Sequence, residues 1–380
     1  MSATGRQSAS EPAASDVADR LREAGFVRLV GAATGDGLAA SGVLARSLAA
    51  RNRPFQVSLA TMPTEGDRAT DADLTVAVGR TDPTADLAVP GVERPASEVA
   101  AAVARELGHE LDGETLALAL AGVAADGRVA DSGLTERAVE AGFERRPGVA
   151  VPTTDLADGL AHSTLVHSPV SGDPEAAASL LADHGLPADA ADLDESGRRH
   201  LASLVALRTV GDDDVPPRGG EAVERALRPL VGGPAVTAGG YADVLDAVAR
   251  ERPGTAVALA LGHGVLGDAL ATWRDHARRA HRGLRAADAD RYDGLFVVRT
   301  DDAPVGAVAR LAHDYRSPEP VTLAATDGRA AVVADRSPGG AVRAAAGAID
   351  GTGEATGSTG RARFDGPAAE FVTAFREAQR

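Results

Sequence analysis

The feature that most constrains the fold is a regular alternation of short apolar runs with longer Ala-rich segments. FVRLV (26–30) is followed by GLAASGVLARSLAAR (37–51), and DLTVAVG (73–79) is followed by SEVAAAVARELG (97–108). The short runs have the length of buried strands and the long ones the length of helices. Strands that take turns with helices predict an α/β fold with a parallel sheet covered by helices.

The same alternation predicts two domains. A helix is expected over about 115–124, a connecting helix over 197–210, and a Pro- and Gly-rich linker over 211–234. TAVALALG (255–262) then restarts the alternation as a strand, and 268–288 is expected to form a long helix. Further segments are predicted as strands at 292–299, 320–326 and 330–335 and as a helix at 304–316. The predicted divisions are a disordered tail (1–15), a first domain (16–190), a connecting helix and linker (191–250) and a smaller second domain (251–380).

The charged residues indicate a salt-rich cell. Asp and Glu number 55 against 39 Lys plus Arg, and no lysine occurs, so every fixed side-chain cation is arginine. This composition favours a halophile, while a GC-rich genome that replaces lysine codons is the alternative. The net charge of -16 does not exclude nucleic acid, because the Debye length at about 1 M salt is roughly 3 Å. The absence of cysteine excludes thiolate metal sites, and without a long apolar run we expect a cytoplasmic protein with no membrane segment.

Two carboxylates stand where ligands could bind. Asp36 follows the first predicted strand, at the edge where open α/β sheets bind ligands. Taken alone, it is more simply a helix N-cap or a turn residue ahead of Gly37. Asp126 ends the helix expected at 115–124, and its Asp-Gly pair is common in turns.

Two other patterns are less specific. The Gly-rich run 337–360 contains Gly339, Gly340, Arg343 and Gly347, whose backbone and guanidinium could approach a phosphate. It could equally be a flexible surface loop. Of the nine histidines, His276 and His281 lie five apart, which does not place two metal ligands on one helical face. We expect most of the histidines to be surface or packing residues.

The order of these features resembles the DHH phosphoesterase superfamily, specifically its archaeal RecJ-like exonucleases. ATGDGLAASG (33–42) resembles the family's first acidic motif with its helix, and LALAGVAADG (118–127) resembles its last acidic motif. GGAVRAAAG (339–347) is similar to the substrate loop of the DHH-associated domain, and Arg250 falls at a phosphate-facing arginine. The resemblance implies a two-domain fold and a pair of Mn²⁺ ions that activate water.

The departures from the family pattern bear on activity. The histidine and first aspartate of the first motif are Ala32 and Thr34 here, and the second acidic motif reads Val78-Gly79. The Asp-His-His triplet is absent, and the histidine of the substrate loop is replaced within Ala341-Val342. Asp36 and Asp126 remain as vestigial ligands, and Asp82 and Asp86 fall out of register. No metal is therefore expected to bind tightly, with Mn²⁺ as the cofactor if the protein is active.

The resulting hypothesis is a catalytically degenerate RecJ-like protein that acts as an accessory in DNA replication or repair. Its ligand would be single-stranded nucleic acid, held by Arg250, Arg336 and Arg343, or a replisome protein such as the GINS complex. One alternative is an active Mn²⁺-dependent exonuclease for single-stranded DNA or RNA, or a small-nucleotide phosphoesterase. The other is a non-catalytic partner subunit of an active RecJ paralogue.

Overall fold

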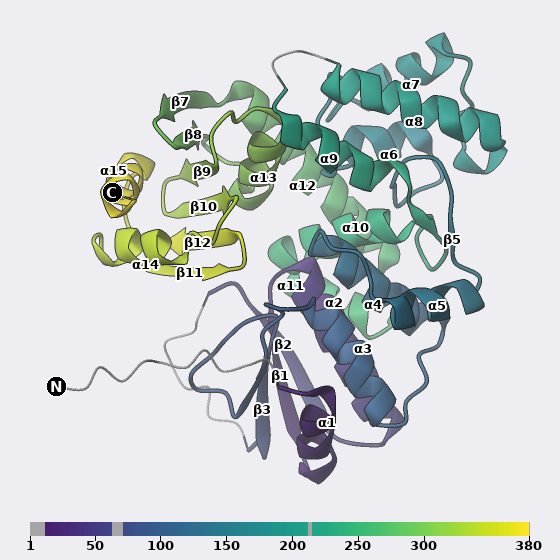
Figure 1. Ribbon diagram of the computed structural model, residues 1–380, viewed down its shortest axis with the longest axis vertical. Helices are drawn as coiled ribbons and strands as arrows, with labels where there is room; N and C mark the ends of the chain where they lie inside the picture. Colours follow the sequence, from purple (N-terminus) through teal and green to yellow (C-terminus); the bar gives the residue numbers. More distant parts are fainter. Residues whose placement is uncertain (1–11, 63–70, 212–214, 380) are drawn as a thin grey trace.

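The computed structural model describes residues 12–62, 71–211 and 215–379. The chain forms an N-terminal sheet, a central group of helices and a C-terminal sheet (Figure 1). Residues 1–11 of the predicted tail lie outside the described residues, and its last two residues, Ala14 and Ser15, belong to helix α1 (Ala14–Glu23), so the tail was predicted too long.

The N-terminal sheet is parallel, as predicted. Its strand order is β2-β1-β3-β4, and every neighbouring pair runs in the same direction. The strands are β1 (Val27–Ala32), β2 (Phe55–Ala60), β3 (Leu74–Val78) and β4 (Leu87–Val89). Because all four are parallel, their carboxyl ends meet at one edge of the sheet.

Helices α2 (Gly35–Ala50), α3 (Ala96–Glu106) and α4 (Gly113–Ala125) pack together beside this sheet. Their sequences are rich in Ala, so the helix axes approach closely: a Cβ on Gly42 would lie 2.7 Å from a methyl of Leu118. Helix α10 (Ala238–Glu251) returns from far along the chain to pack on α2 and α4. The core of the first domain therefore includes residues from beyond the predicted boundary at 190.

The central region is mostly helical. Its elements are α5 (Ser132–Glu140), β5 (Glu144–Arg145), α6 (Leu156–His162), α7 (Pro174–Asp183), the 3-10 helix η1 (Ala190–Asp192), α8 (Glu195–Val210), α9 (Pro217–Leu227) and β6 (Leu230–Val231). Helix α8 confirms the predicted connecting helix. The expected linker contains a helix, α9, because Pro217 starts it and Ala222, Val223 and Ala226 give it a buried apolar face.

The strand predicted at 255–262 is wrong, because these residues lie in and just after helix α11 (Pro253–Ala260). A short apolar run does not by itself distinguish a strand from a buried helix, and here Pro253 at the first helical position starts a helix. The predicted long helix is confirmed as α12 (Leu266–Ala286).

The C-terminal sheet has the order β11-β12-β10-β9-β8-β7, and only its β8–β9 pair is parallel. The strands are β7 (Asp288–Tyr292), β8 (Leu295–Arg299), β9 (Val321–Thr326), β10 (Arg329–Ala334), β11 (Thr352–Thr356) and β12 (Thr359–Arg363); the helices are α13 (Val305–Tyr315), α14 (Gly339–Gly347) and α15 (Ala368–Ala378). The single strand expected at 292–299 is interrupted by a turn at Asp293-Gly294, where Gly294 has a φ of 74°. The α/β class is confirmed.

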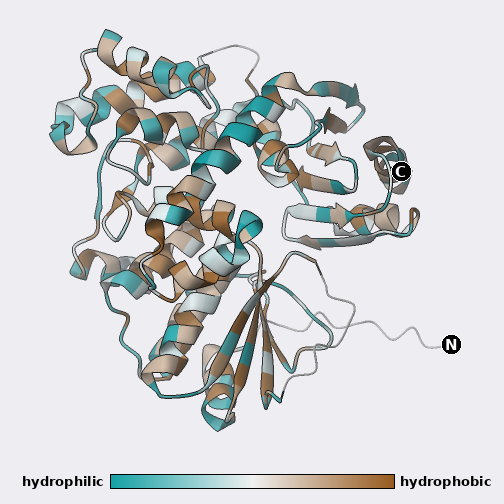
Figure 2. Ribbon diagram, turned by 180° about the vertical axis from the view of Figure 1, so that it is seen from behind, coloured by the Kyte–Doolittle hydropathy of each residue, from teal (hydrophilic) through white to brown (hydrophobic). Residues whose placement is uncertain are grey.

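The chain has three hydrophobic cores, in which small aliphatic side chains are joined by a few aromatic ones, such as Trp273 in the first and Phe371 and Phe375 in the third. The first joins the N-terminal sheet to α2, α3, α4 and α10, the second joins the central helices to α13, and the third lies under α14 and α15. The strands of the N-terminal sheet are coloured mostly as hydrophobic in the hydropathy view (Figure 2). Within the described ranges, no helix combines the length and the apolarity that spanning a membrane requires.

Candidate functional site

A cavity of about 470 Å³ lies at the carboxyl ends of the N-terminal strands. Thr34 follows β1, Gly79 and Arg80 follow β3, and Gly91 follows β4; all four residues line it. Gly79 has a φ of 68°, and a Cβ there would lie 2.9 Å from the Cα of Gly37. Only glycine therefore allows the end of β3 to approach the start of α2 so closely.

The opposite wall of the cavity comes from the C-terminal domain. It includes Arg310 and His313 of α13, residues 331–334 of β10 and the β11–β12 hairpin. In Figure 1 this hairpin is the part of the C-terminal sheet that lies nearest the N-terminal strands. The cavity is thus a cleft between the two sheets, and we call it the interdomain cavity.

Asp36 caps a helix, although not the one that carries it. Helix α2 is capped by Thr34, whose Oγ1 accepts from the Gly37 amide at 3.0 Å. The Asp36 carboxylate instead accepts from the amides of Ala96 and Ser97 at 2.8 and 2.9 Å, and from the Ser97 hydroxyl at 2.5 Å. These groups begin α3, where Pro95 offers no side-chain cap. The interpretation of Asp36 as the N-cap of its own helix is therefore wrong, because Thr34 caps α2 while Asp36 lies in the first turn of α2 and caps the start of α3.

The environment of Asp36 favours its neutral form despite these hydrogen bonds. Burial raises the pKa of Asp36 above the usual value of 3.8, while the hydrogen bonds from Ser97 and Ala96 and the charge of Arg128 oppose the shift. Burial raises the pKa because it removes water from the charged carboxylate.

Asp126 stands at the C-terminal end of α4 and also lines the cavity. Burial and the charge of Asp36 raise the pKa of Asp126 to about 7, while Arg128 lowers it. Asp36 and Asp126 both line the cavity, so the fold brings the two carboxylates to one site.

Arg128 occupies the space beside these carboxylates. Its Nε lies 3.0 Å from Asp126 Oδ2, and its two terminal nitrogens donate to the carbonyls of Glu93 and Val92 at 2.7 and 2.9 Å. The sequence analysis missed Arg128, although its place two residues after Asp126 was a usable signal. A fixed cation at this position neutralises the charge that would attract a metal ion.

The described ranges contain no group of three or more His, Asp or Glu side chains arranged to hold a metal ion. Asp82 does not substitute for the missing ligands, because its carboxylate accepts from the amide and hydroxyl of Thr84. Asp86 accepts from the Thr75 amide at 2.8 Å. Neither residue lines the cavity.

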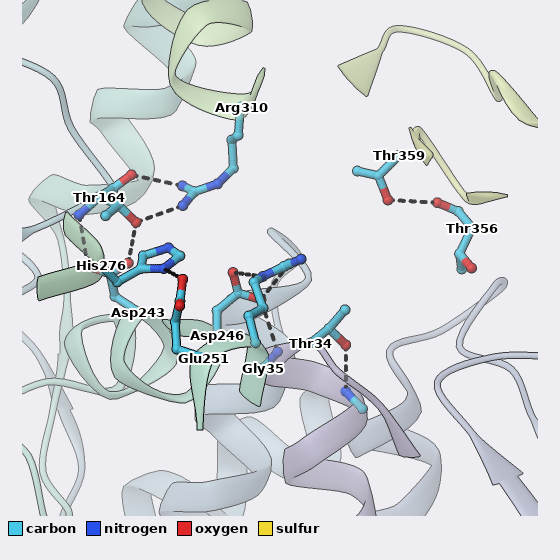
Figure 3. A network of polar contacts seen from close by, with 12 residues as sticks. Thr34, Gly35, Thr164, Asp243, Asp246, Glu251, His276, Arg310, Thr356 and Thr359 are labelled. Atoms are coloured by element: carbon cyan, nitrogen blue, oxygen red, sulfur yellow. Dashed lines mark hydrogen bonds and ion pairs between the residues drawn. The ribbon is translucent and has the colours of Figure 1, made fainter. Parts of the chain in front are cut away.

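Arg250 lines the cavity, as the sequence indicated, but it is paired. Its Nε and Nη2 donate to the Asp246 carboxylate at 3.0 and 2.9 Å, and Asp246 also accepts from the Gly35 amide at 3.1 Å (Figure 3). The nearby guanidinium holds the pKa of Asp246 well below its usual range, against the effect of burial. The pair joins α10 to the first turn of α2.

A second network fixes Arg310 on the other wall. Its terminal nitrogens donate to the Thr164 carbonyl and hydroxyl at 2.9 and 2.8 Å (Figure 3). The Asp243 carboxylate accepts from the Thr164 amide and from the Trp273 indole, both at 2.8 Å. Asp243 is buried, so this network is a structural joint between α10, α12 and α13.

The predicted glycine-rich site lies on helix α14. Gly339, Gly340, Arg343 and Gly347 belong to this helix and are not among the residues that line the cavity. Arg336 is exposed just before it. The part of the run that does line the cavity is its second half, residues 354–360 of the β11–β12 hairpin. Phosphate binding by α14 stays a prediction.

The histidines pack as expected where they are buried. Rings from His162, His276, His281 and His313 are almost fully covered. His276 Nδ1 lies 2.9 Å from Glu251, and His281 contacts the Ser163 carbonyl at 3.0 Å. These rings therefore stabilise helix contacts.

The overall fold is similar to two solved structures across nearly the whole chain. A crystal structure of exonuclease RecJ bound to manganese matches with a TM-score of 0.52 and 17% identity, covering 97% of this chain and 95% of that one. A crystal structure of CDC45 from Entamoeba histolytica matches with a TM-score of 0.57 and 10% identity, covering 96% of this chain and 97% of that one. The fold is thus DHH/RecJ-like.

Sequence comparison places the chain more closely. The family model described as the C-terminal domain of uncharacterized protein rrnAC1427 matches residues 287–377. Uncharacterized protein rrnAC1427 of Haloarcula marismortui is 53% identical over 381 residues, which cover all of both chains. The expected halophilic composition agrees with this relative. The chain therefore belongs to the family of the haloarchaeal protein rrnAC1427.

Proposed function

We propose that this chain is a non-hydrolytic protein of the DHH/RecJ fold that binds single-stranded nucleic acid in the interdomain cavity. Its role would be that of an accessory in DNA replication or repair. The observation that carries the proposal is that several arginine side chains line a cavity whose residues, within the described ranges, form no metal-holding group.

The cavity lining is less acidic than the protein as a whole, because its arginines slightly outnumber its carboxylates, which are Asp36, Asp126, Asp246, Asp314 and Glu354. Six arginines line it, whereas the whole chain carries a net charge of -16. They are Arg80, Arg128, Arg225, Arg250, Arg310 and Arg361. Arginine suits phosphate at high salt, because its bidentate hydrogen bonds persist where long-range attraction is screened. A local cluster of this kind supports phosphate as the ligand.

The carboxylates of the cavity do not fit a paired manganese centre. Two such ions need several oxygen and imidazole ligands with free lone pairs. Both oxygens of Asp36 accept hydrogen bonds from the start of α3, and Asp126 is paired with Arg128. We therefore expect no metal-dependent cleavage of phosphodiesters.

A combined binding and cleavage assay tests the proposal. Fluorescently labelled single-stranded DNA and RNA are titrated in molar KCl, with and without Mn²⁺. We expect binding without cleavage, and we expect R225Q, which removes an exposed arginine from the cavity mouth, to weaken it several-fold and lower the salt slope by about one. R208Q removes an equal charge from an exposed position on α8, outside the cavity lining, and is the matched control.

Two other outcomes would contradict the proposal. Robust Mn²⁺-dependent cleavage that D36A or D126A abolishes would identify an active exonuclease or phosphoesterase. Absence of nucleic-acid binding, together with copurification of a RecJ paralogue or a GINS-like replisome protein, would identify a protein-binding accessory instead.

A further inference from the structure

Arg80 is a buried cation whose hydrogen-bonding groups are not used. Its side chain follows β3 directly, and the residue is only 3% exposed. Among the described residues, Nε and Nη2 have no hydrogen-bond partner, and Nη1 reaches only the Met62 carbonyl at 3.4 Å. A guanidinium carries five N–H donors and a permanent charge, so burying it unpaired is unfavourable.

The nearest carboxylate does not satisfy Arg80. Glu354 of β11 reaches across the cavity, and its Oε2 lies 3.8 Å from Arg80 Nη2. This distance allows an ion pair but is too long for a hydrogen bond. Burial also raises the pKa of Glu354, so the carboxylate favours its neutral form more than a free one does. Arg80 and Glu354 both line the cavity, and the Nε and Nη2 atoms of Arg80 are themselves buried.

Arg361 of β12 presents a second cation to the same space. Within the described ranges, it makes no side-chain hydrogen bond or ion pair, although it lines the cavity. Burial and the charge of Arg250 lower the pKa of Arg361 to about 10, and Arg80 contributes in the same direction, while the carboxylates of Asp246 and Glu354 oppose the shift. Glu354 lies opposite Arg361 on the neighbouring strand, so one carboxylate is shared by Arg80 and Arg361.

We propose that Arg80 and Arg361 form a two-armed oxyanion site that takes a phosphate monoester or a diphosphate group. This deepens the proposed function, because it names the part of the nucleic acid that enters the cavity. An end group fits better than an internal phosphodiester: Arg80 is nearly buried, so a continuous strand cannot reach it as closely as a terminal phosphate can. The two arms belong to different sheets, so the bound group ties the domains together.

The oxygens of such a phosphate group would accept hydrogen bonds from the donors of Arg80 that have no partner. Nε and Nη2 of Arg80 lie on one edge of the guanidinium and match two oxygens of a tetrahedral anion. The residues 356–360 of the hairpin that line the cavity add threonine and serine hydroxyls beside Arg361. Glu354 competes for the same arginines and is displaced from Arg80 when the anion binds.

Calorimetry with inorganic pyrophosphate in molar KCl tests the site without a nucleic acid. We expect the wild-type chain to bind pyrophosphate and to melt at a higher temperature in its presence. R80Q and R361Q should each weaken binding by about tenfold or more, since each removes charged hydrogen bonds. R363Q removes an exposed arginine from the same strand, outside the cavity lining, and should bind as the wild type does.

A further variant distinguishes loss of the binding site from loss of the fold. E354Q keeps both arginines and removes their competing carboxylate, so we expect it to bind pyrophosphate several-fold more tightly. Failure of the wild type to bind, unchanged binding in R80Q, or weaker binding in E354Q would overturn the site. The Arg80–Glu354 contact would then be an internal ion pair only.

Oligonucleotides separate this inference from the proposed function. We expect strands with a terminal phosphate to bind more tightly than strands with two hydroxyl ends, and R80Q should abolish that difference. Equal binding of both kinds of strand would refute the oxyanion site and leave nucleic-acid binding standing. Binding of pyrophosphate with no binding of any strand would refute the proposed function and leave the oxyanion site standing.

Discussion

At the scale of single residues, Asp126 is a group whose charge state depends on the fold. Burial and the neighbouring Asp36 raise the pKa of Asp126 to about 7, so the folded protein binds this proton more tightly than the unfolded chain does. The contribution of Asp126 to the unfolding free energy therefore falls as the pH rises from about 4 to about 7. Burial lowers the pKa of His167, His281 and His313, so these groups act in the opposite direction over much of the same range. D126N removes only the falling contribution, so its unfolding free energy relative to that of the wild type should increase with pH.

Denaturant unfolding at a series of pH values measures this effect. D268N removes an exposed aspartate from α12 and controls for the loss of one charge. Parallel stability curves for the wild type and D126N between pH 4 and 7 would show that Asp126 titrates as an ordinary aspartate.

At the scale of elements, the start of α3 depends on a carboxylate from another helix. Asp36 accepts hydrogen bonds from two amides at the start of α3. The N-cap residue of α3, Pro95, makes no side-chain hydrogen bond to these amides. D36A leaves these buried donors unpaired and should lower the unfolding free energy by about 1 to 3 kcal/mol. S97A removes only the hydroxyl contact and should cost about 1 kcal/mol. Chemical unfolding without metal gives both values; an unchanged or higher stability in D36A would contradict the capping role.

Helices and strands were predictable where the apolar pattern of a segment agreed with the residues that mark its two ends. The segments that became β1, α2, β3 and α3 have clear lengths and polar boundaries, and the structure confirms them. Helix α11 was mistaken for a strand because eight apolar residues fit either structure, and the decision depends on Pro253 and on packing. Strands β11 and β12 escaped notice, since Gly and Thr give them little apolar alternation.

At the scale of the whole molecule, the N-terminal core depends on residues far along the chain. Val244, Leu245 and Val248 of α10 and Trp273 of α12 belong to the same core as the N-terminal sheet. A fragment of residues 12–190, close to the predicted first domain, leaves that core uncovered on one side. We expect it to lack a cooperative thermal transition, whereas the full chain has one. Calorimetry and circular dichroism check this; a sharp transition in the fragment would show that α10 is dispensable.

The interdomain cavity was only partly foreseeable for the same reason. Asp36, Asp126 and Arg250 were found because they stand in recognisable local patterns. Arg80 and Arg361 lie 281 positions apart in the numbering and share no motif, so only the tertiary fold shows that they face one space. Whether two such distant residues line one cavity depends on how the two sheets are placed, and short sequence motifs do not determine that placement.

The late position of α10 has a consequence for biosynthesis. The strands and helices that emerge first from the ribosome cannot bury their apolar faces until the segment around Trp273 has also been made. The newly made N-terminal half of the chain therefore exposes apolar surface until synthesis of that segment is complete. In a cytosol of high ionic strength, where such surfaces associate more strongly, nascent chains of this family should depend heavily on chaperones.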